Sequence, residues 1–446
     1  MNLHRLLAQR AAPLRIGLIG AGKFGTMFLA QVRRTPGLHV AGLADLNLNR
    51  AGEALRRAGW PGEAIQPSVD QALKTKGVAL FDDPFALIKA PGVDIIIDST
   101  GSPTAGVAHA LATIEAGRHI IMVNVEADAL CGPALAERAR KAGVVYSLAY
   151  GDQPALIAEQ VDWARASGFD VIAAGKGTKY LPGYHHVTPA DVWRHYGLTP
   201  EQAERGGMNP QMFNSFLDGT KSAIEMTAVA NATGLTPAPD GLGFPSCGTR
   251  ALADVLRPRA EGGTLHHKGQ VEVISSMGTD GKELTDHLRW GVYVVFEAPS
   301  DYVQACFREY GLVTDSTGRY SALYKPFHLI GLELGISVAS VGVRGEPTGQ
   351  PDAFRADAVA CAKRDLKAGE TLDGEGGFTV YGRLMPSSGS VAAGALPIGL
   401  AHGVKLKRPV TRDGVVRADD VTLDEGSLAV RTRREMEAKF AALNAA

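Results

Sequence analysis

Between residues 14 and 150 the chain alternates short apolar runs, rich in β-branched residues, with amphipathic stretches of helical period. A parallel sheet covered by helices on both faces produces this alternation, because its strands are buried on both sides. The strands that the pattern predicts begin at Arg15, His39, Val93, His119 and Val144. The helices that it predicts begin at Lys23, Leu48 and Thr104, with an inserted helix within residues 61–83. Residues 1–150 are therefore expected to form a doubly wound α/β domain.

The pattern changes after Asp152, and a second, α/β domain with an open sheet is expected over residues 151–345. Residues 176–199 mix Gly, Tyr, His and Pro without a clean period, which is typical of loops that line sites. The elements predicted beyond this loop are a helix over residues 209–235, strands from Gln270 and Trp290, and a long apolar helix from Tyr324. Because this last helix is apolar almost all round, it is expected to be buried between the first two domains and to complete the first with residues 325–343.

The stretch at residues 344–352 is rich in Gly and Pro and is predicted to be a linker. Short Gly-containing strands and a charged last helix follow it, so residues 346–446 are expected to form a small β-rich third domain. The total of 446 residues agrees with several domains, because one hydrophobic core rarely serves a chain of that length.

The strongest local signal is the sequence GAGKFG, which stands between the first predicted strand and the first predicted helix. Gly20 allows a tight turn, Gly22 lets a pyrophosphate approach the backbone, and Gly25 permits close packing of the helix on the strand. The helix start at Lys23 and Phe24 adds free N–H groups and a partial positive charge, which favour phosphate. The unit predicts a Rossmann dinucleotide-binding site. The alternative is a glycine turn in an α/β domain that binds no such ligand.

Asp45 ends the second predicted strand 20 residues after Gly25, which is the spacing of the acid that binds the adenosine ribose. A carboxylate at this place repels a 2′-phosphate and favours NAD. Arg50 and Asn47 lie close enough in the sequence to accommodate that phosphate. Both NAD and NADP therefore remain open as the cofactor.

Two further strand ends carry polar residues. Ser99, Thr100 and Gly101 follow the run VDIIID, and Asn124 and Glu126 follow the run HIIMV. Ligands of open α/β sheets bind at this edge, so these residues are predicted to approach the nicotinamide ribose. The alternative for the first group is an ordinary turn before the next helix.

The charges of the chain nearly balance, with 46 Lys and Arg against 47 Asp and Glu. Neither nucleic acid nor a membrane is expected as a partner, and a phosphorylated or carboxylated small molecule is. No apolar run approaches the ~18 residues of a membrane span, and the N-terminal stretch lacks the apolar core of a secretory signal, so a cytoplasmic location is expected. The four cysteines form no CxxC pair, which favours buried free thiols over a zinc knuckle or a disulfide framework.

Four segments carry a resemblance to a known family, namely STGSPTAG, EAGRHIIMVNVEADAL, AYGDQPALI and YKPFHLIGLELGISV. They resemble the homoserine dehydrogenase-like NAD(P)-dependent oxidoreductases and, within them, the 1-deoxy-D-xylulose 5-phosphate reductoisomerase-like (DRL-type) family. The resemblance covers about the first 345 residues. It implies a Rossmann domain, a central α/β catalytic domain whose open sheet serves oligomerisation as a homodimer or homotetramer, and a C-terminal domain. Two later segments, residues 361–373 and 396–423, resemble the small β-rich SAF domain.

A reductoisomerase is the activity that the resemblance implies, in which a phosphorylated ketose is rearranged and then reduced by hydride from NADPH. Such enzymes usually use a divalent cation, and Mg²⁺ or Mn²⁺ suits oxygen ligands. Asp152 is the candidate metal ligand and also a candidate catalytic acid. Gln153 and Pro154 follow it, where the main family has an Asp-Ser-Glu triplet. The alternative for Asp152 is the N-cap of the helix that begins there.

Hydride transfer at a carbon–oxygen bond needs a proton donor or acceptor at the oxygen and a cation beside the developing alkoxide. Lys176 and Lys221 are the predicted catalytic lysines. Asp218 and Glu225 lie three and four residues from Lys221, so all three are predicted to share one helix face. In homoserine dehydrogenases a lysine and acidic residues of the corresponding helix surround the substrate hydroxyl. The alternatives are a solvent-exposed salt bridge for Lys221 and a solvated surface lysine for Lys176.

The candidate substrate-binding residues are Lys179, Tyr320, Lys325 and His328. Lys325 and His328 are expected to begin the buried helix, where a free helix N-terminus and a cation can hold a phosphate or a carboxylate. The alternative is a helix start that packs on the core. Three functions remain open: a reductoisomerase on a sugar phosphate, a plain dehydrogenase of a small hydroxy compound such as homoserine or a sugar acid, and a dinucleotide-binding sensor.

Overall fold

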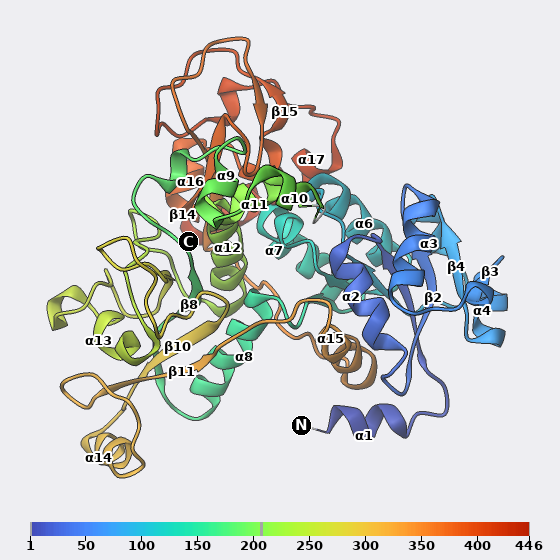
Figure 1. The fold of residues 1–446 in the computed structure, drawn as a ribbon, viewed down its shortest axis with the longest axis horizontal. Coiled ribbons are helices and arrows are strands. Elements are labelled where there is room, and N and C mark those ends of the chain that lie inside the picture. Colours follow the sequence, from blue (N-terminus) through green and yellow to red (C-terminus); the bar gives the residue numbers. More distant parts are fainter. Residues whose placement is uncertain (1, 206–207, 446) are drawn as a thin grey trace. The chain divides into compact units, whose positions relative to one another are not determined.

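The computed structural model describes residues 2–205 and 208–445. The chain forms two compact units, whose elements are labelled in Figure 1. The first unit contains the residues up to Leu156 together with His328–Asp352, and the second contains Ile157–Phe327 together with the residues from Ala353 onward. The segment predicted as a separate C-terminal domain therefore lies in the same compact unit as the middle of the chain.

The first unit is built on a seven-stranded sheet with the strand order β3-β4-β2-β1-β5-β6-β7, in which every neighbouring pair is parallel. All five strands predicted in this region are present. The region predicted as an inserted helix also contains the edge strand β3 and its neighbour β4. The strands are β1 (Leu14–Ile19), β2 (Leu38–Ala44), β3 (Ile65–Gln66), β4 (Val78–Phe81), β5 (Ile95–Asp98), β6 (His119–Met122) and β7 (Tyr146–Leu148).

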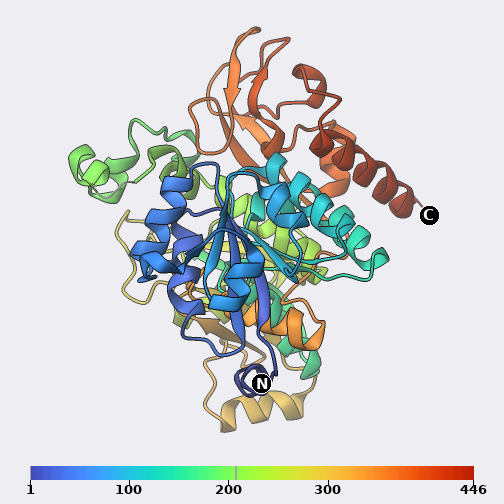
Figure 2. The ribbon, with the colours of Figure 1, turned by 90° about the vertical axis from the view of Figure 1, so that its right-hand side faces the viewer.

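Helices cover both faces of this sheet, which confirms the doubly wound α/β prediction. One face is packed by α1, α2, α3 and α15 through side chains such as Phe28 and Leu55. The other is packed by α4, α5 and α6 through Leu87 and Ile88, and Figure 2 shows these blue and cyan elements from a second direction. The helices are α1 (Leu3–Ala8), α2 (Lys23–Val32), α3 (Leu48–Arg57), α4 (Val69–Thr75), α5 (Pro84–Lys89), α6 (Pro103–Glu115), α7 (Val125–Lys141) and α8 (Gln153–Ala166), the last of which continues into the second unit.

The prediction of a long apolar helix that begins at Tyr324 is wrong. Residues up to Lys325 belong to a strand, and helix α15 (Gly335–Ala339) begins only ten residues later, continued by a π-helical turn at Ser340–Arg344. Pro326 explains part of the difference, because the residue before a proline is pushed toward extended backbone. Gly331 explains the rest, since its φ of +81° interrupts a right-handed helix. Within α15 and the π-helical turn, Val338 and Val341 are buried in the core of the first unit.

The second unit contains a four-stranded mixed sheet with the order β11-β10-β8-β9. The strands predicted from Gln270 and Trp290 are confirmed as β9 and β10. Strand β8 was not predicted, and it ends within the segment that was expected to be a loop. Trp163 of α8 meets Phe296 of β10 edge to face at 5.5 Å between ring centroids, so α8 packs on one face of the sheet. The strands are β8 (Asp170–Thr178), β9 (Gln270–Ser275), β10 (Val292–Glu297) and β11 (Tyr320–Lys325).

The helix predicted over residues 209–235 is broken into α11 (Pro210–Leu217) and α12 (Thr220–Thr233). Asp218 caps the end of α11, and Gly219 turns the chain with a φ of +86°, a conformation that suits glycine. Asp218 therefore does not share a helix with Lys221 and Glu225, and that part of the prediction is wrong. The other helices before residue 328 are α9 (Val192–Tyr196), α10 (Pro200–Arg205), α13 (Leu252–Val255) and α14 (Asp301–Glu309).

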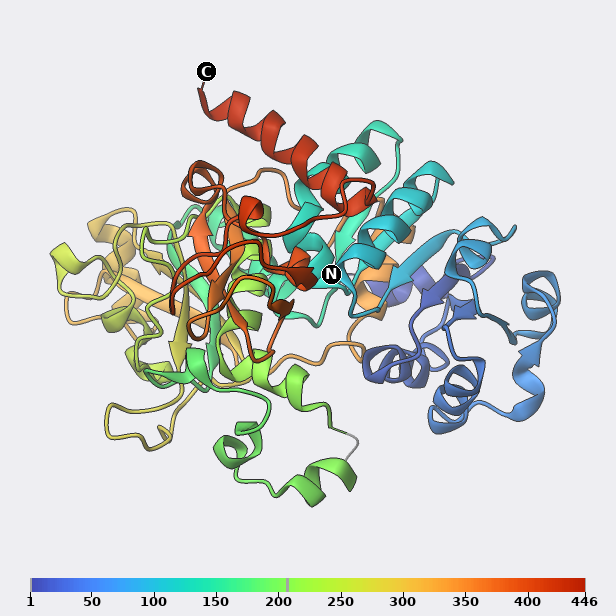
Figure 3. The ribbon, with the colours of Figure 1, turned by 90° about the horizontal axis from the view of Figure 1, so that it is seen from above.

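The C-terminal segment forms two antiparallel strand pairs, β12 with β14 and β13 with β15. Its last helix is the red helix that ends at the C-terminus in Figure 3. Arg433 of this helix is fully buried and holds it to β12 through an ion pair with Asp357 at 2.5 Å. The predicted short strands and last helix are confirmed as β12 (Ala356–Ala362), β13 (Thr371–Asp373), β14 (Val380–Pro386), α16 (Ser387–Ala393), β15 (His402–Lys405) and α17 (Leu428–Ala445).

All four cysteines are free, and Cys131, Cys247 and Cys361 are buried, as predicted. Among the described residues, no helix is both long enough and apolar enough to cross a membrane.

Asp128 of α7 is a fully buried carboxylic acid beside β7, where it accepts a hydrogen bond from the Tyr146 hydroxyl at 2.8 Å. Burial raises the pKa of Asp128 to about 7, although the hydrogen bond from Tyr146 acts against this rise. An aspartic acid in an unfolded chain ionises near pH 4. Between pH ~4 and ~7 this carboxyl group is therefore protonated in the folded chain and ionised in the unfolded chain. As a result, the free energy of unfolding falls as the pH rises through this window, by on the order of 4 kcal/mol.

We expect Asp128→Asn to flatten this pH dependence, because the amide keeps an acceptor for Tyr146 and carries no charge at any pH. Thermal unfolding at pH about 5 and about 8.5 should show that the variant gains stability over the wild type at the higher pH. Asp94→Asn is the control, because the pKa of Asp94 is lowered in the folded chain whereas that of Asp128 is raised. Burial acts to raise the pKa of Asp94, but its hydrogen bonds with Arg15 outweigh burial and lower it, so its loss should destabilise equally at both pH values. Equal pH slopes for Asp128→Asn and the wild type would contradict the prediction.

Candidate active site

The glycine-rich turn between β1 and α2 has the geometry that a pyrophosphate requires. Gly20 has a φ of +99°, and a Cβ on Gly25 would lie 2.2 Å from the Gly20 carbonyl oxygen. A Cβ on Gly22 would meet nothing within 4 Å, so this glycine faces open space. Gly22 is also the N-cap of α2, and it has no side chain to cap the N–H groups that begin at Lys23 and Phe24. These three glycines therefore fit the roles that the sequence predicts for them, with N–H groups available to a phosphate.

Asp45 lies just after β2 and is buried against this turn. Its carboxylate accepts hydrogen bonds from the backbone N–H groups of Ala21 and Asn47, both at 2.9 Å. Arg50 of α3 pairs with it at 2.7 Å, while most of the arginine side chain stays exposed. Burial acts to raise the pKa of Asp45, but the bonds from Arg50, Asn47 and Ala21 outweigh it and lower that pKa. Asp45 is thus an ionised acid whose charge Arg50 offsets, which weakens its repulsion of a 2′-phosphate.

The polar residues at the ends of β5 and β6 hold the neighbouring turns together. The Ser99 hydroxyl donates to the carbonyl oxygens of Ile19 and Gly20 at 2.8 and 2.9 Å. The Asn124 amide donates to the Thr100 hydroxyl at 3.1 Å, and its oxygen caps α7. Ser102 caps α6, which begins at Pro103, so the alternative of an ordinary turn also describes this segment.

Two further cofactor-binding candidates lie beside these turns. Gly101 is exposed, and Glu126 is half-buried in the first turn of α7. The structure therefore brings the predicted cofactor-binding residues of β1, β5 and β6 to one edge of the first sheet, as the order of the parallel strands requires.

Asp152 takes the N-cap position of α8, and its side chain accepts from the Gln153 backbone N–H at 3.0 Å. This position before the helix agrees with the N-cap alternative. Within the described parts of the chain, no group of three or more His, Cys, Asp or Glu side chains could hold a metal ion. The predicted Mg²⁺ or Mn²⁺ site at Asp152 has no support from the geometry.

Lys176 of β8 and Glu225 of α12 form an ion pair in the interior of the second unit. Their side chains are 5% and 2% exposed, so the alternative of a solvated Lys176 is wrong. A buried lysine and a buried carboxylate tolerate such a place only as partners. The structure thus joins two predicted catalytic residues that are 49 positions apart in the sequence.

Lys221 and Asp218 lie a few residues before Glu225 in the chain. Lys221 is half-buried in the first turn of α12 and shares that helix with Glu225. Asp218 is fully buried and forms its ion pair with Lys363 of the C-terminal segment, at 2.7 Å. Asp218 is therefore not part of the predicted grouping on one helix face.

Cationic side chains gather at the edge of the sheet where β8 and β11 end. Lys176 of β8 and Lys325 of β11 both pair with Val292 of β10, which lies between them. Their side chains therefore project from the same face of the sheet. Lys179 follows the end of β8, and Arg289 precedes the start of the antiparallel neighbour β10. Desolvation lowers the pKa of Lys179, and the charge of Arg289 lowers it further.

Arg289 was not predicted, and it is the main addition to the candidate site. It lies 3.3 Å from Glu283, and its guanidinium stacks over the Trp290 ring at 4.8 Å. The sequence carries a weak signal for it in the cluster HLRW just before an apolar strand, but its neighbourhood depends on the antiparallel pairing of β8 with β10.

Tyr320 and His328 do not join this edge as predicted. Tyr320 begins β11, at the opposite end of the strand from Lys325, and is buried in the core with its hydroxyl bonded to Glu261. His328 lies in the connection after β11 rather than at a helix start, because α15 begins later. Lys325 ends a strand for the same reason, so its predicted place at a helix N-terminus is wrong.

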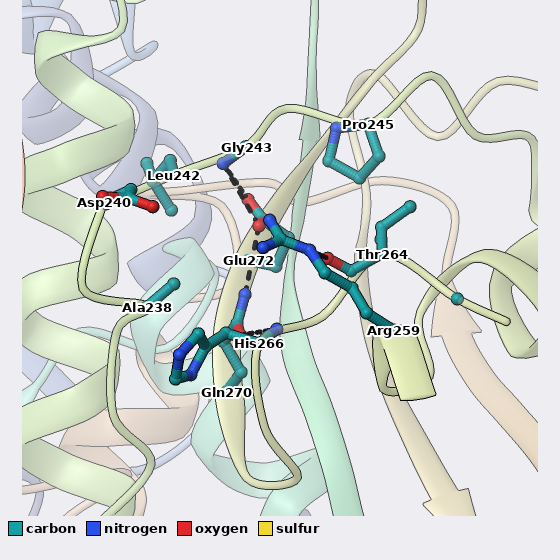
Figure 4. A pocket seen from close by; sticks show the side chains of 12 residues that line it. Ala238, Asp240, Leu242, Gly243, Pro245, Arg259, Thr264, His266, Gln270 and Glu272 are labelled. Atoms are coloured by element: carbon teal, nitrogen blue, oxygen red, sulfur yellow. Dashed lines mark hydrogen bonds between the residues drawn. The ribbon is translucent and has the colours of Figure 1, made fainter. Parts of the chain in front are cut away.

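A cavity of about 410 Å³ lies beside the edge strand β9 and is drawn in Figure 4. Glu272 at its floor accepts from the backbone N–H groups of Gly243 and Val273, at 3.0 and 2.8 Å. Burial raises the pKa of Glu272 to about 7, against these hydrogen bonds. Glu272 of β9 pairs with Gly175, the residue before Lys176 in β8. Because successive residues of a strand point to opposite faces, the side chains of Glu272 and Lys176 project from opposite faces of the sheet. The cavity is therefore separate from the Lys176–Glu225 pair.

Two family models match the chain. Residues 14–150 match "Oxidoreductase family, NAD-binding Rossmann fold", and residues 151–334 match "Oxidoreductase DRL, catalytic domain". The chain is therefore an oxidoreductase, with one region that matches an NAD-binding Rossmann domain and one that matches the DRL catalytic domain. The SAF-like domain and the placement among homoserine dehydrogenase-like proteins stay predictions.

Similar proteins extend over parts of the chain. Two 4-hydroxy-tetrahydrodipicolinate reductases from strains of Anaeromyxobacter dehalogenans are 37% and 36% identical over 128 residues, which is 28% of this chain and 42% of each relative. The myo-inositol dehydrogenase of Lactobacillus casei is similar over 41% of this chain and 50% of its own, with 13% identity and a TM-score of 0.28. A NAD-binding oxidoreductase from Klebsiella pneumoniae is similar over 38% of this chain and 43% of its own, with 22% identity and a TM-score of 0.28.

Substitutions in the glycine turn should separate cofactor binding from folding. We expect Gly22→Ala to weaken the binding of NADH and NADPH at least about tenfold without lowering the melting temperature, because its Cβ enters open space that a pyrophosphate would occupy. Gly25→Ala should lower both the affinity for the cofactors and the melting temperature, because its Cβ would overlap the Gly20 carbonyl oxygen. Fluorescence titration and thermal unfolding measure the two effects. Wild-type affinity in Gly22→Ala would show that no pyrophosphate approaches this residue.

The Asp45–Arg50 pair should set the preference between the two cofactors. We expect Asp45→Ala to shift the ratio of dissociation constants toward NADPH and Arg50→Ala to shift it toward NADH, each by about tenfold, or ~1.4 kcal/mol. The reason is that the first change removes a charge that repels a 2′-phosphate and the second removes the cation that offsets it. Arg56→Ala, on the same helix and exposed, is the control. An unchanged ratio in both variants would remove the pair from cofactor choice.

Proposed function

We propose that this protein is an NAD(P)H-dependent reductoisomerase-like oxidoreductase that acts on a phosphorylated ketose, of the type that converts 1-deoxy-D-xylulose 5-phosphate to 2-C-methyl-D-erythritol 4-phosphate. The observation that carries the proposal is the buried Lys176–Glu225 pair, set in the same sheet row as Lys325. A carbonyl group needs a buried proton donor, and a phosphate needs cations nearby, and this sheet edge offers both. The match to the DRL catalytic domain agrees with it.

The residues divide into two roles. Lys176 donates a proton to the substrate oxygen while the carbonyl carbon is reduced, and Glu225 holds the lysine in place through their ion pair. Lys179, Arg289 and Lys325 bind the phosphate through charge-assisted hydrogen bonds. The glycine-rich turn would hold the pyrophosphate of a nicotinamide cofactor, which would supply the hydride. We assign no step to a metal ion, because the donor set at Asp152 does not fit one.

A plain dehydrogenase of a small hydroxy acid is the second candidate, because the same cations suit a carboxylate as well as a phosphate. One pair of assays separates the candidates. The purified enzyme with NADPH and 1-deoxy-D-xylulose 5-phosphate should oxidise the cofactor and form a branched polyol phosphate. A dehydrogenase would instead reduce NAD(P)⁺ with homoserine or a sugar acid and leave the sugar phosphate unchanged, which would overturn the first proposal.

We expect Lys176→Ala to lower turnover by at least ~10²-fold, the lower end for the loss of general acid–base assistance. The dissociation constants of both cofactors should stay unchanged, because the glycine turn lies in the other unit. Lys282→Ala, an exposed lysine of the same unit, is the matched control. If Lys176→Ala keeps near-wild-type turnover in a folded protein, the assignment of the site is wrong.

A further inference from the structure

A buried lysine of the C-terminal segment contacts the turn between α11 and α12. Lys363 directly follows β12, and its side chain is 2% exposed. Its ammonium lies 2.7 Å from the Asp218 carboxylate and donates to the carbonyl oxygens of Val187 and Gly377, both at 2.7 Å. Lys363 is therefore held inside the second unit by one ion pair and two hydrogen bonds.

Asp218 connects Lys363 with the start of α12 through its carboxylate. Its other carboxylate oxygen accepts from the Thr220 backbone N–H at 2.9 Å, and Thr220 is the first residue of the helix. The carbonyl oxygen of Asp218 is bonded to the His185 ring at 2.6 Å. Gly219 then turns the chain in a left-handed conformation, and the Asp218 carboxylate, through its bond to the Thr220 N–H, contributes to fixing where the helix begins.

The same surface of the C-terminal segment bonds these helices at further points. The Asn214 amide donates to the carbonyl oxygens of Val187 and Gly376 at 2.9 Å each. The Gly382 backbone N–H donates to the Thr220 hydroxyl at 2.7 Å. A Cβ on Gly382 would lie 2.9 Å from the Thr220 methyl carbon, so β14 and α12 are in close contact. The C-terminal segment is thus bonded directly to the helix that carries Lys221 and Glu225.

We propose that Lys363 is a positioning residue, which fixes Asp218 and the start of α12 and thereby places Glu225 against Lys176. The proposal assigns Asp218 a positioning role instead of the catalytic role that the sequence predicted. It also makes the C-terminal segment a required part of the site. It rests on the proposed function only for the catalytic role of the Lys176–Glu225 pair, and the placement of α12 can be measured separately.

The test compares two buried ion pairs of the C-terminal segment. Removing one partner alone leaves a buried unpaired charge and can unfold the protein, so both partners are changed together. Asp218→Asn with Lys363→Met removes the pair that touches α12. Asp357→Asn with Arg433→Met removes the pair that anchors α17 and has the same burial. Each double variant is examined by hydrogen–deuterium exchange and by steady-state kinetics with NADPH and 1-deoxy-D-xylulose 5-phosphate.

We expect the first double variant to exchange its amides over residues 218–226 at least about tenfold faster than the wild type, with exchange in α17 unchanged. Its kcat should fall at least about tenfold, while the Kd of NADPH stays the same. The second double variant should show faster exchange in α17 and keep the wild-type kcat.

Unchanged exchange over residues 218–226 in the folded first variant would overturn the proposal, whatever happens to activity. Equal losses of kcat in both double variants would also overturn it, because they would show a general effect of stability. If the wild type has no turnover with any substrate offered, the proposed function fails, and the exchange measurement still decides whether Lys363 positions α12.

Discussion

A charged side chain can stay inside a protein only beside an opposite charge or enough hydrogen-bonding partners, and this constraint organises the second unit. Two lysines are buried there, and each has a carboxylate within reach. Lys176 approaches α12 from the central sheet, and Lys363 approaches its start from the C-terminal segment. Because both pairs converge on α12, the sheet, the helix and the C-terminal segment fix one another's positions.

The first unit depends on a different constraint, the space available to backbone atoms. At Gly25 even a methyl group would overlap the carbonyl of Gly20, whereas at Gly22 it would meet nothing. Close packing on one side of the turn and open space on the other leave the N–H groups of α2 facing outward. Anion binding at this place follows from the backbone and needs no charged side chain. The glycine-rich turn lies in the first unit and the buried lysines lie in the second. This agrees with the proposal that the first unit binds the cofactor and the second binds the substrate.

Much of the first unit could be predicted from the sequence, because each predicted strand is a continuous apolar run and the crossovers have a helical period. Strands β3 and β4 were missed, because they lie on either side of α4 in a segment whose helical pattern was taken for the whole insertion. The helix predicted from Tyr324 failed for a local reason, because Pro326 and Gly331 stop a helix that hydropathy alone favours. In the same way a helical period over residues 209–235 concealed the break at Gly219. Apolar periodicity reports burial, and the backbone conformation of single residues decides where an element begins.

The candidate site was predictable in its members but less so in its grouping. Lys176 stood out because a lysine between two glycines in an uncharged segment has no evident solvent contact, and it is buried. Its partner could have been any of several acids, since nothing local relates β8 to a helix 49 residues later. Arg289 and Lys363 were missed because their roles arise from pairing between distant segments: β8 with β10 in the first case, and β12 with the turn after α11 in the second. A residue whose function is to fix another residue leaves little trace in its own neighbourhood of the sequence. Such residues are found by following each buried charge to its partner, and here that route leads from Glu225 to Lys176 and from Asp218 to the C-terminal segment.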